Sequence, residues 1–423
     1  MPILRWPWYR LKALIAAVII VFVAFALAGT VSAVAGLKVG ANEYSVGAWE
    51  TRHFAGKWLY LLGAKFREKP GVEQENATLR EFFALTRDID ALEAELSDAD
   101  TRGQGRDETK SGELETKRGR RADIQAETER ILEGRVTEVL GDMGITRSAG
   151  LGRVVWPPVA FDFTDAPRML AESPRDRITL SRQTPLREGL PLPEVERVEE
   201  ETAKRNNTAA LAFPLGGYGA YPTLVDYGDD YLRSARVVTH EWMHNYLFFR
   251  PLGIRYNANN DLRTINEVTA DLVGDEVAKE VVRRWPIEPP KPEPAPATSP
   301  ETPAEQPQRV DGIAELRKLR GEVDALLAAG KVEEAEALME QRRQELAARG
   351  FRVRKINQAY FAFLNLYAGA AGNPVATNPI GPKVDQVRKK TPSLKEFVDV
   401  IGEVTSVREL DEALARLSRA TGS

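Results

Sequence analysis

The stretch that organises this chain reads His240-Glu241-Trp242-Met243-His244. On an α-helix, side chains four positions apart lie on one face, about 6 Å from each other, so both imidazoles can bind one metal ion. The chain has three histidines, and this stretch contains two of them. Cysteine is absent, so a metal must be held by histidine or carboxylate groups. The spacing therefore predicts a helix that carries a divalent metal site, with zinc as the expected ion.

Glu241 is the expected general base. It lies about 100° around the helix from His240, which keeps it off the metal but close to water at the site. Zinc lowers the pKa of such water to about 7, so a nearby carboxylate can accept its proton at neutral pH for attack on a peptide carbonyl. The alternative is a solvated helical stripe without metal, because HExxH also occurs by chance.

The third metal ligand must be a carboxylate, because no histidine follows His244. Glu267 stands 23 residues after it on a second predicted helix, and Asp271 follows on the same face. We expect Glu267 to bind the metal and Asp271 to accept the free ring N–H of a ligand histidine, which fixes the tautomer. A catalytic zinc with three protein ligands keeps its fourth position open.

The two motifs together, HEWMH and Asn266-Glu267-Val268-Thr269-Ala270-Asp271, resemble the HExxH plus NExxxD signature of the thermolysin-like gluzincin zinc metallopeptidases. The resemblance covers about residues 229–275, and the whole chain also resembles uncharacterised single-pass bacterial membrane proteins with this pair of helices. It implies a peptide or protein substrate and an edge strand upstream, within Leu211 to Tyr221, that binds it. It also implies zinc bound by His240, His244 and Glu267, catalysis by Glu241, and support from Asp271.

The chain departs from the gluzincin pattern where the oxyanion of the reaction is stabilised. Thermolysin-like enzymes use a downstream histidine, which this sequence lacks. Tyr360 and Tyr367 lie on one face of a predicted helix and are the candidates to supply a hydroxyl instead. The alternative for both is a buried aromatic stripe. The glycine-containing stretch before the HExxH helix lacks the acidic residue that gluzincin aminopeptidases use, so aminopeptidase activity is unsupported.

Composition excludes some classes of partner. The 423 residues carry 58 basic and 62 acidic side chains, a net charge of -4, so no strong positive field points to nucleic acid. The length allows two or three structural units.

An uncharged segment near the amino terminus predicts a membrane anchor. Residues 13–37 would reach about 37 Å as a helix, which is enough to cross a bilayer. Residues 1–12 hold cationic and aromatic side chains typical of a cytoplasmic flank, so the main domain is expected outside the cell membrane. The alternative is a cleaved signal peptide with a site at Val31-Ser32-Ala33, although the apolar stretch is long for one.

The rest of the chain divides by composition. Residues 38–150 are expected to form a membrane-proximal segment, where His53 is more typical of a surface residue than of a site, and then a helical hairpin with a loose tip at 97–121. Residues 286–310 are rich in proline and predict a linker. Residues 311–423 predict a helical part that closes the cleft, with capping boxes beginning at Ser393 and Ser406.

Residues 151–285 are the expected zinc peptidase domain. Short β-prone pieces at Val159–Phe163, Met169–Glu172, Ile178–Ser181 and Thr208–Pro214 precede the HExxH helix, which predicts an α+β, zincin-like fold. We therefore expect a membrane-anchored zinc metallopeptidase. The alternative is a membrane-tethered interaction or scaffold protein that retains a structural zinc site, which four protein ligands would indicate.

Overall fold

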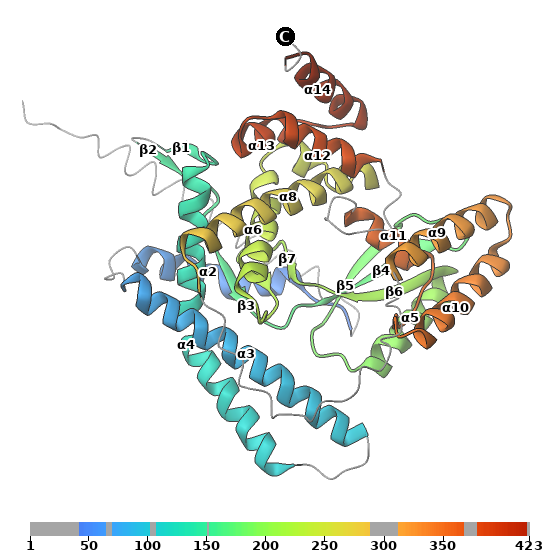
Figure 1. The fold of residues 1–423 in the computed structure, drawn as a ribbon, viewed down its shortest axis with the longest axis horizontal. Coiled ribbons are helices and arrows are strands. Elements are labelled where there is room, and N and C mark those ends of the chain that lie inside the picture. The colour runs from blue at the N-terminus through green and yellow to red at the C-terminus, as the bar shows by residue number, and fades with distance from the viewer. Residues whose placement is uncertain are drawn as a thin grey trace, which may run out of the picture.

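Figure 1 shows the protein as a computed structural model that describes residues 42–64, 70–101, 107–149, 152–287, 312–367 and 379–420. The fold is mixed α+β, mostly helical with small sheets, as the sequence predicts. Within those ranges, no helix is both long and apolar enough to cross a membrane. The predicted anchor at 13–37 and nearly all of the predicted linker at 286–310 lie outside the described residues.

The described strands form three small sheets. One holds β3 (Phe161–Phe163), β8 (Thr223–Val225) and β7 (Gly217–Tyr218), in that order. Its β3–β8 pair is parallel and its β7–β8 pair is antiparallel, so β7 is an edge strand. The second sheet is antiparallel, with β4 (Arg168–Pro174) between β5 (Arg182–Leu186) and β6 (Thr208–Pro214). The third is a hairpin of β1 (Arg147–Ala149) and β2 (Gly152–Val154).

The predicted strand at Ile178–Ser181 is wrong, because β5 begins only at Arg182, directly after the predicted segment. Ile178 and Leu180 are apolar because they join a hydrophobic cluster with Phe363. β5 tolerates Pro185 because it lies at the edge of its sheet, where a missing N–H breaks no ladder bond.

Two long helices, α6 (Tyr231–Leu247) and α8 (Asn260–Arg284), pack against each other at the centre of the molecule. Asp230 caps α6 by accepting from the backbone N–H of Arg233 at 2.7 Å, and Asn259 caps α8 in the same way. Trp242 is 1 % exposed, and its indole N–H donates to Pro157 O at 2.9 Å. The helix that carries the histidines is therefore fixed from both its cap and its core side.

A helical hairpin, α3 (Val72–Thr101) and α4 (Glu108–Asp142), projects from this centre in Figure 1. The loose tip predicted at 97–121 is wrong for the described residues there, because α3 continues to Thr101 and α4 begins at Glu108. Ion pairs between the two helices connect the charged side chains, such as Arg118 with Glu93 at 2.8 Å. Mixed charges that suggested a solvated loop are instead matched across the hairpin.

The carboxy-terminal helices return to the central pair. Of these, α12 (Ile380–Lys390) packs on α8, and α11 (Gln358–Leu364), followed by the 3₁₀ turn Asn365–Tyr367, packs on β4 and β6. Ser393 and Ser406 each accept from the backbone N–H three residues on, so both predicted caps are confirmed. The remaining helices are α5 (Leu192–Asn206), α7 (Pro251–Ile254), α9 (Gly312–Ala328), α10 (Val332–Ala348), α13 (Leu394–Gly402) and α14 (Val407–Ala420).

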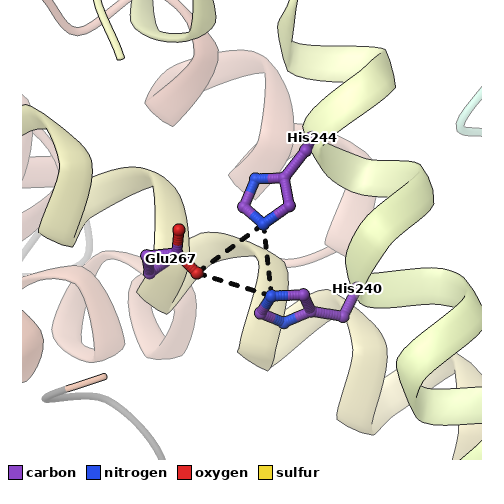
Figure 2. Close-up of side chains that lie close together, drawn as sticks. All are labelled: His240, His244 and Glu267. Atoms are coloured by element: carbon purple, nitrogen blue, oxygen red, sulfur yellow. Dashed lines mark hydrogen bonds and ion pairs between the residues drawn. The ribbon is translucent and has the colours of Figure 1, made fainter. Parts of the chain in front are cut away.

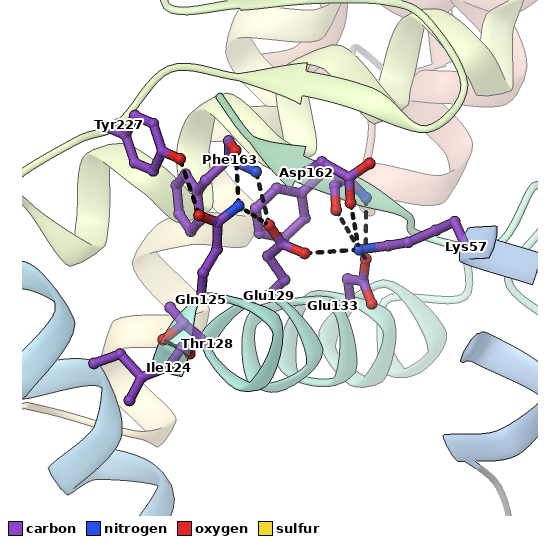
Figure 3. Close-up of polar contacts among 10 residues, drawn as sticks. Lys57, Ile124, Gln125, Thr128, Glu129, Glu133, Asp162, Phe163 and Tyr227 are labelled. Carbon is purple, nitrogen blue, oxygen red and sulfur yellow. Dashed lines mark hydrogen bonds and ion pairs between the residues drawn. The ribbon is translucent and has the colours of Figure 1, made fainter. Parts of the chain in front are cut away.

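A buried lysine on helix α2 (Val46–Ala64) makes a cluster of charged contacts with the core (Figure 3). The Lys57 ammonium lies 3.0 Å from Glu129, 2.9 Å from Glu133 and 3.0 Å from Asp162, and it also donates to Phe161 O. The side chain of Lys57 is 7 % exposed. A buried charge is tolerated only with such partners, so this cluster ties α2 to α4 and β3.

Candidate metal centre

The two helices that carry the motifs approach closely because of a glycine. A Cβ added at Gly274 on α8 would lie 3.0 Å from Arg236 O and 3.4 Å from His240 Cβ on α6. A side chain at this position would separate the helices. The small residue therefore brings the carboxylates of α8 within reach of the histidines of α6.

His240, His244 and Glu267 converge on one point (Figure 2). The two Nε2 atoms are 3.2 Å apart, and Glu267 Oε2 lies 3.5 Å from His240 Nε2 and 3.6 Å from His244 Nε2. Glu267 is 3 % exposed. The structure thus brings together the three residues that the sequence predicts as metal ligands.

The other nitrogen of each imidazole faces an oxygen acceptor. His240 Nδ1 lies 3.1 Å from Asp271 Oδ1, and His244 Nδ1 lies 2.7 Å from Asn266 Oδ1. In this arrangement both Nδ1–H groups donate, and both Nε2 atoms present lone pairs. Asp271 therefore occupies the supporting position expected for it. Asn266 has the same role for His244, which was not predicted, because only its place in the motif marks it in the sequence.

Three lone-pair donors that point at one another repel unless a cation lies between them. Two imidazole nitrogens and one carboxylate oxygen form a donor set that suits zinc, and it leaves one coordination position for solvent or substrate. Within the described residues, no fourth histidine or carboxylate joins the group. The residues present therefore fit a zinc ion that keeps one coordination position open.

Charge in the site follows from burial and these contacts. Burial opposes ionisation of Glu267, yet the two histidines hold the pKa of its carboxyl well below its usual range. Burial likewise opposes protonation of His240, yet Asp271 and Glu267 raise its pKa well above the ordinary value. The donor set attracts positive charge strongly, so protons and a metal ion compete for the same nitrogens.

Glu241 faces the edge strand β7. A Cβ added at Gly217 would lie 2.7 Å from Glu241 Cγ and 2.9 Å from its Oε1, and one at Gly219 would lie 3.6 Å from Oε2. Burial raises the pKa of the Glu241 carboxyl, against the effect of the two histidines. A buried carboxylate with a raised pKa is a stronger proton acceptor than an exposed one, which suits a general base.

Tyr256 lies in the loop between the two helices and contacts the third ligand. Its hydroxyl donates to Glu267 Oε1 at 2.6 Å, which leaves Oε2 directed at the histidines. Its ring lies 5.9 Å from the ring of His244, centroid to centroid. Sequence reasoning missed Tyr256, because the loop has no periodicity that fixes where its side chains point.

A cleft of about 960 Å³ opens onto these groups. Its lining includes His240, Glu241, His244 and Glu267, together with residues of β5, β7 and the turn after α6. From the carboxy-terminal part, Phe363 on α11 contributes to the wall.

The chain matches no known family, no curated protein and no solved structure. The site is therefore interpreted from its own geometry.

The other residues proposed from the sequence lie elsewhere. Tyr360 is absent from the lining of the cleft and stacks on Phe213, with ring centroids 6.3 Å apart, where it is partly buried among apolar residues. The side chain of Tyr367 lies outside the described part of the chain. His53 stacks on Trp49 on α2, and its Nδ1 lies 2.9 Å from Trp49 O, apart from the metal group. The tyrosines that do line the cleft are Tyr218 and Tyr256.

Proposed function

We propose that this protein is a zinc-dependent peptidase of the gluzincin type, with a zincin-like central domain. The observation that carries the proposal is the convergence of His240, His244 and Glu267 at the base of an open cleft that also contains Glu241. When bound there, zinc would polarise a carbonyl and lower the pKa of water. His240, His244 and Glu267 would hold it.

Each residue of the site has a separate task in peptide hydrolysis. Glu241 accepts a proton from the attacking water and passes it to the leaving amine, for which its buried carboxylate is suited. Asp271 and Asn266 keep the two imidazoles in the tautomer that presents Nε2 to the cleft. The hydroxyl of Tyr256 donates to Glu267 Oε1 at 2.6 Å, which keeps Oε2 turned toward the histidines.

The edge strand β7 supports a peptide substrate in extended form. Its neighbour in the sheet is β8, and its other side is not paired with a described strand. Gly217, Tyr218 and Gly219 line the cleft beside Glu241. An extended peptide can add to such an edge through backbone hydrogen bonds, which would hold a peptide bond close to the general base. This segment falls within the upstream stretch that the resemblance implies for substrate binding.

The proposed location rests on the sequence. The uncharged residues 13–37 and the cationic flank before them support a single-pass anchor with the peptidase domain outside the cytoplasmic membrane. The substrates would then be peptides or proteins on that side of the membrane.

The test compares wild type with Glu241→Gln in metal content and in cleavage of an unstructured protein such as casein. We expect the variant to retain zinc and to lose activity by about 10²- to 10⁴-fold. Glu200→Gln, at an exposed position of α5, is the matched control and should behave as wild type. Equal activity in wild type and Glu241→Gln would remove Glu241 from the mechanism. Bound zinc without cleavage in any of the proteins would favour the non-catalytic scaffold.

A further inference from the structure

Three large apolar side chains that line the cleft are exposed, and a fourth lies on the β1–β2 hairpin. The exposed fractions are 43 % for Val154, 62 % for Phe248, 43 % for Phe249 and 71 % for Ile254. Single exposed apolar residues are ordinary on protein surfaces, but a cluster marks a surface that contacts something apolar. Phe248, Phe249 and Ile254 fall within seven residues of chain and line the cleft. We call the four residues the rim patch.

The rim patch is continuous across two elements. The rings of Phe248 and Phe249 meet edge to face, with centroids 5.3 Å apart. The Arg147 guanidinium lies 5.3 Å from the centroid of the Phe249 ring, and Val154 is the direct partner of Arg147 in the β1–β2 hairpin. Arg147 therefore links the hairpin, and Val154 beside it, to the apolar side chains at the end of α6.

Arginines surround the rim patch. Arg147 and Arg153 lie on the hairpin, and Arg255 directly follows Ile254. In the described ranges, none of these three has a carboxylate within ion-pair distance, whereas Arg250 is paired with Asp399 at 2.9 Å. Apolar side chains among unneutralised arginines suit the interface of an anionic bilayer, where the former enter the acyl boundary and the latter meet lipid phosphates.

The length of chain before the described part limits how far the cleft can lie from a membrane. Asn42 O accepts from Arg187 N at 3.0 Å and Tyr44 N donates to Pro185 O at 2.8 Å, so this segment is fixed beside β5. Pro185 itself lines the cleft. The uncharged segment ends at residue 37, and five residues of fully extended chain span at most about 18 Å. An anchor at 13–37 therefore holds the β5 side of the cleft close to the bilayer.

We propose that the rim patch rests on the surface of an anionic bilayer, so that the cleft opens at the membrane. The chemistry of the partner is that of lipid headgroups and the upper acyl chain. This proposal depends on the predicted anchor and does not depend on peptidase activity.

The absence of cysteine from the chain allows a direct test with single-cysteine variants. Ile254→Cys and Phe248→Cys would each be labelled with the fluorophore nitrobenzoxadiazole in the full-length protein. The labelled protein would be reconstituted in vesicles of phosphatidylcholine and phosphatidylglycerol that contain lipid with a shallow spin label. Leu192→Cys, at an apolar position 49 % exposed at the start of α5, is the matched control.

We expect spin-labelled lipid to quench the probes at 248 and 254, and to leave the probe at 192 close to its intensity without quencher. Replacing phosphatidylglycerol with phosphatidylcholine should reduce the quenching, because the arginines lose their anionic partners. Equal quenching at the three positions would overturn the proposal. The proposal would also be overturned if spin-labelled lipid left the probe at 254 unquenched and an unstructured protein shifted its emission. That result would assign the rim patch to substrate binding. Neither result depends on whether Glu241 is catalytic.

Discussion

Replacing Gly217 with alanine tests whether β7 positions the general base. The new Cβ would lie 2.7 Å from Glu241 Cγ and 2.9 Å from the backbone oxygen of Leu224. Ordinary contact begins near 3.4 Å, so the carboxylate or the strand has to move by about 0.7 Å. A misplacement of about 1 Å can reduce a catalysed rate about 10²-fold, so we expect kcat/KM to fall about 10- to 100-fold.

The adjacent glycine supplies the control. A Cβ at Gly216 would meet only Val237 Cγ2, at 3.6 Å, which is ordinary van der Waals contact. Gly216→Ala should therefore keep activity and stability close to wild type, whereas Gly217→Ala should lose about 1–3 kcal/mol of unfolding free energy through overpacking. Cleavage assays, urea unfolding and zinc content would be measured on both. Wild-type kcat/KM in Gly217→Ala would refute the placement of Glu241 against β7.

Three further results follow from the contacts. Asp271→Asn and Asn266→Ala should each weaken zinc binding about 10- to 100-fold in a chelator competition, while the fold stays intact. Tyr256→Phe should also weaken zinc binding, because Glu267 Oε1 loses its hydrogen bond, and an unchanged zinc affinity would exclude this role for the hydroxyl. Burial raises the pKa of Glu133 from 4.5 to about 7, so between these pH values the folded state keeps a proton that the unfolded chain releases. The free energy of unfolding that this group contributes is therefore lost as the pH rises from about 4.5 to about 7. Between pH 5 and 8, Glu133→Gln should therefore lose less unfolding free energy than wild type, by roughly 1–3 kcal/mol. Lys57→Met should be destabilised at both pH values, by about 3–5 kcal/mol, because it leaves buried carboxylates unpaired.

The metal group was predictable because helical spacing is nearly invariant. Positions 240 and 244 share a face in any α-helix, and 267 and 271 do the same, so the only open question was whether the two faces meet. The structure answers it at Gly274, where the helices touch. Short-range rules were likewise sufficient for the caps at Ser393 and Ser406.

Features that depend on long-range contacts were harder to predict. Tyr256 and Tyr360 are both tyrosines near apolar residues in the sequence, but only Tyr256 lines the cleft, because loop closure and not periodicity sets its direction. The described residues of 97–121 were mispredicted as a loose segment because charges are matched across α3 and α4, which no local window of sequence contains. The start of β5 was misplaced because the apolar side chain of Leu180 packs against α11, and Leu180 does not pair within a sheet.

The two imidazoles of the site are not equivalent. The carboxylate of Asp271 accepts a hydrogen bond from Nδ1–H of His240, whereas the neutral amide oxygen of Asn266 accepts one from Nδ1–H of His244. The imidazole of His240 is thereby made the more electron-rich of the two, so it would hold a bound metal ion more strongly. On acidification or chelation, a bound ion should therefore be released first by His244, which lies nearer the turn after α6. Exchanging the acid and the amide between positions 266 and 271 should reverse the order in which the two histidines release it.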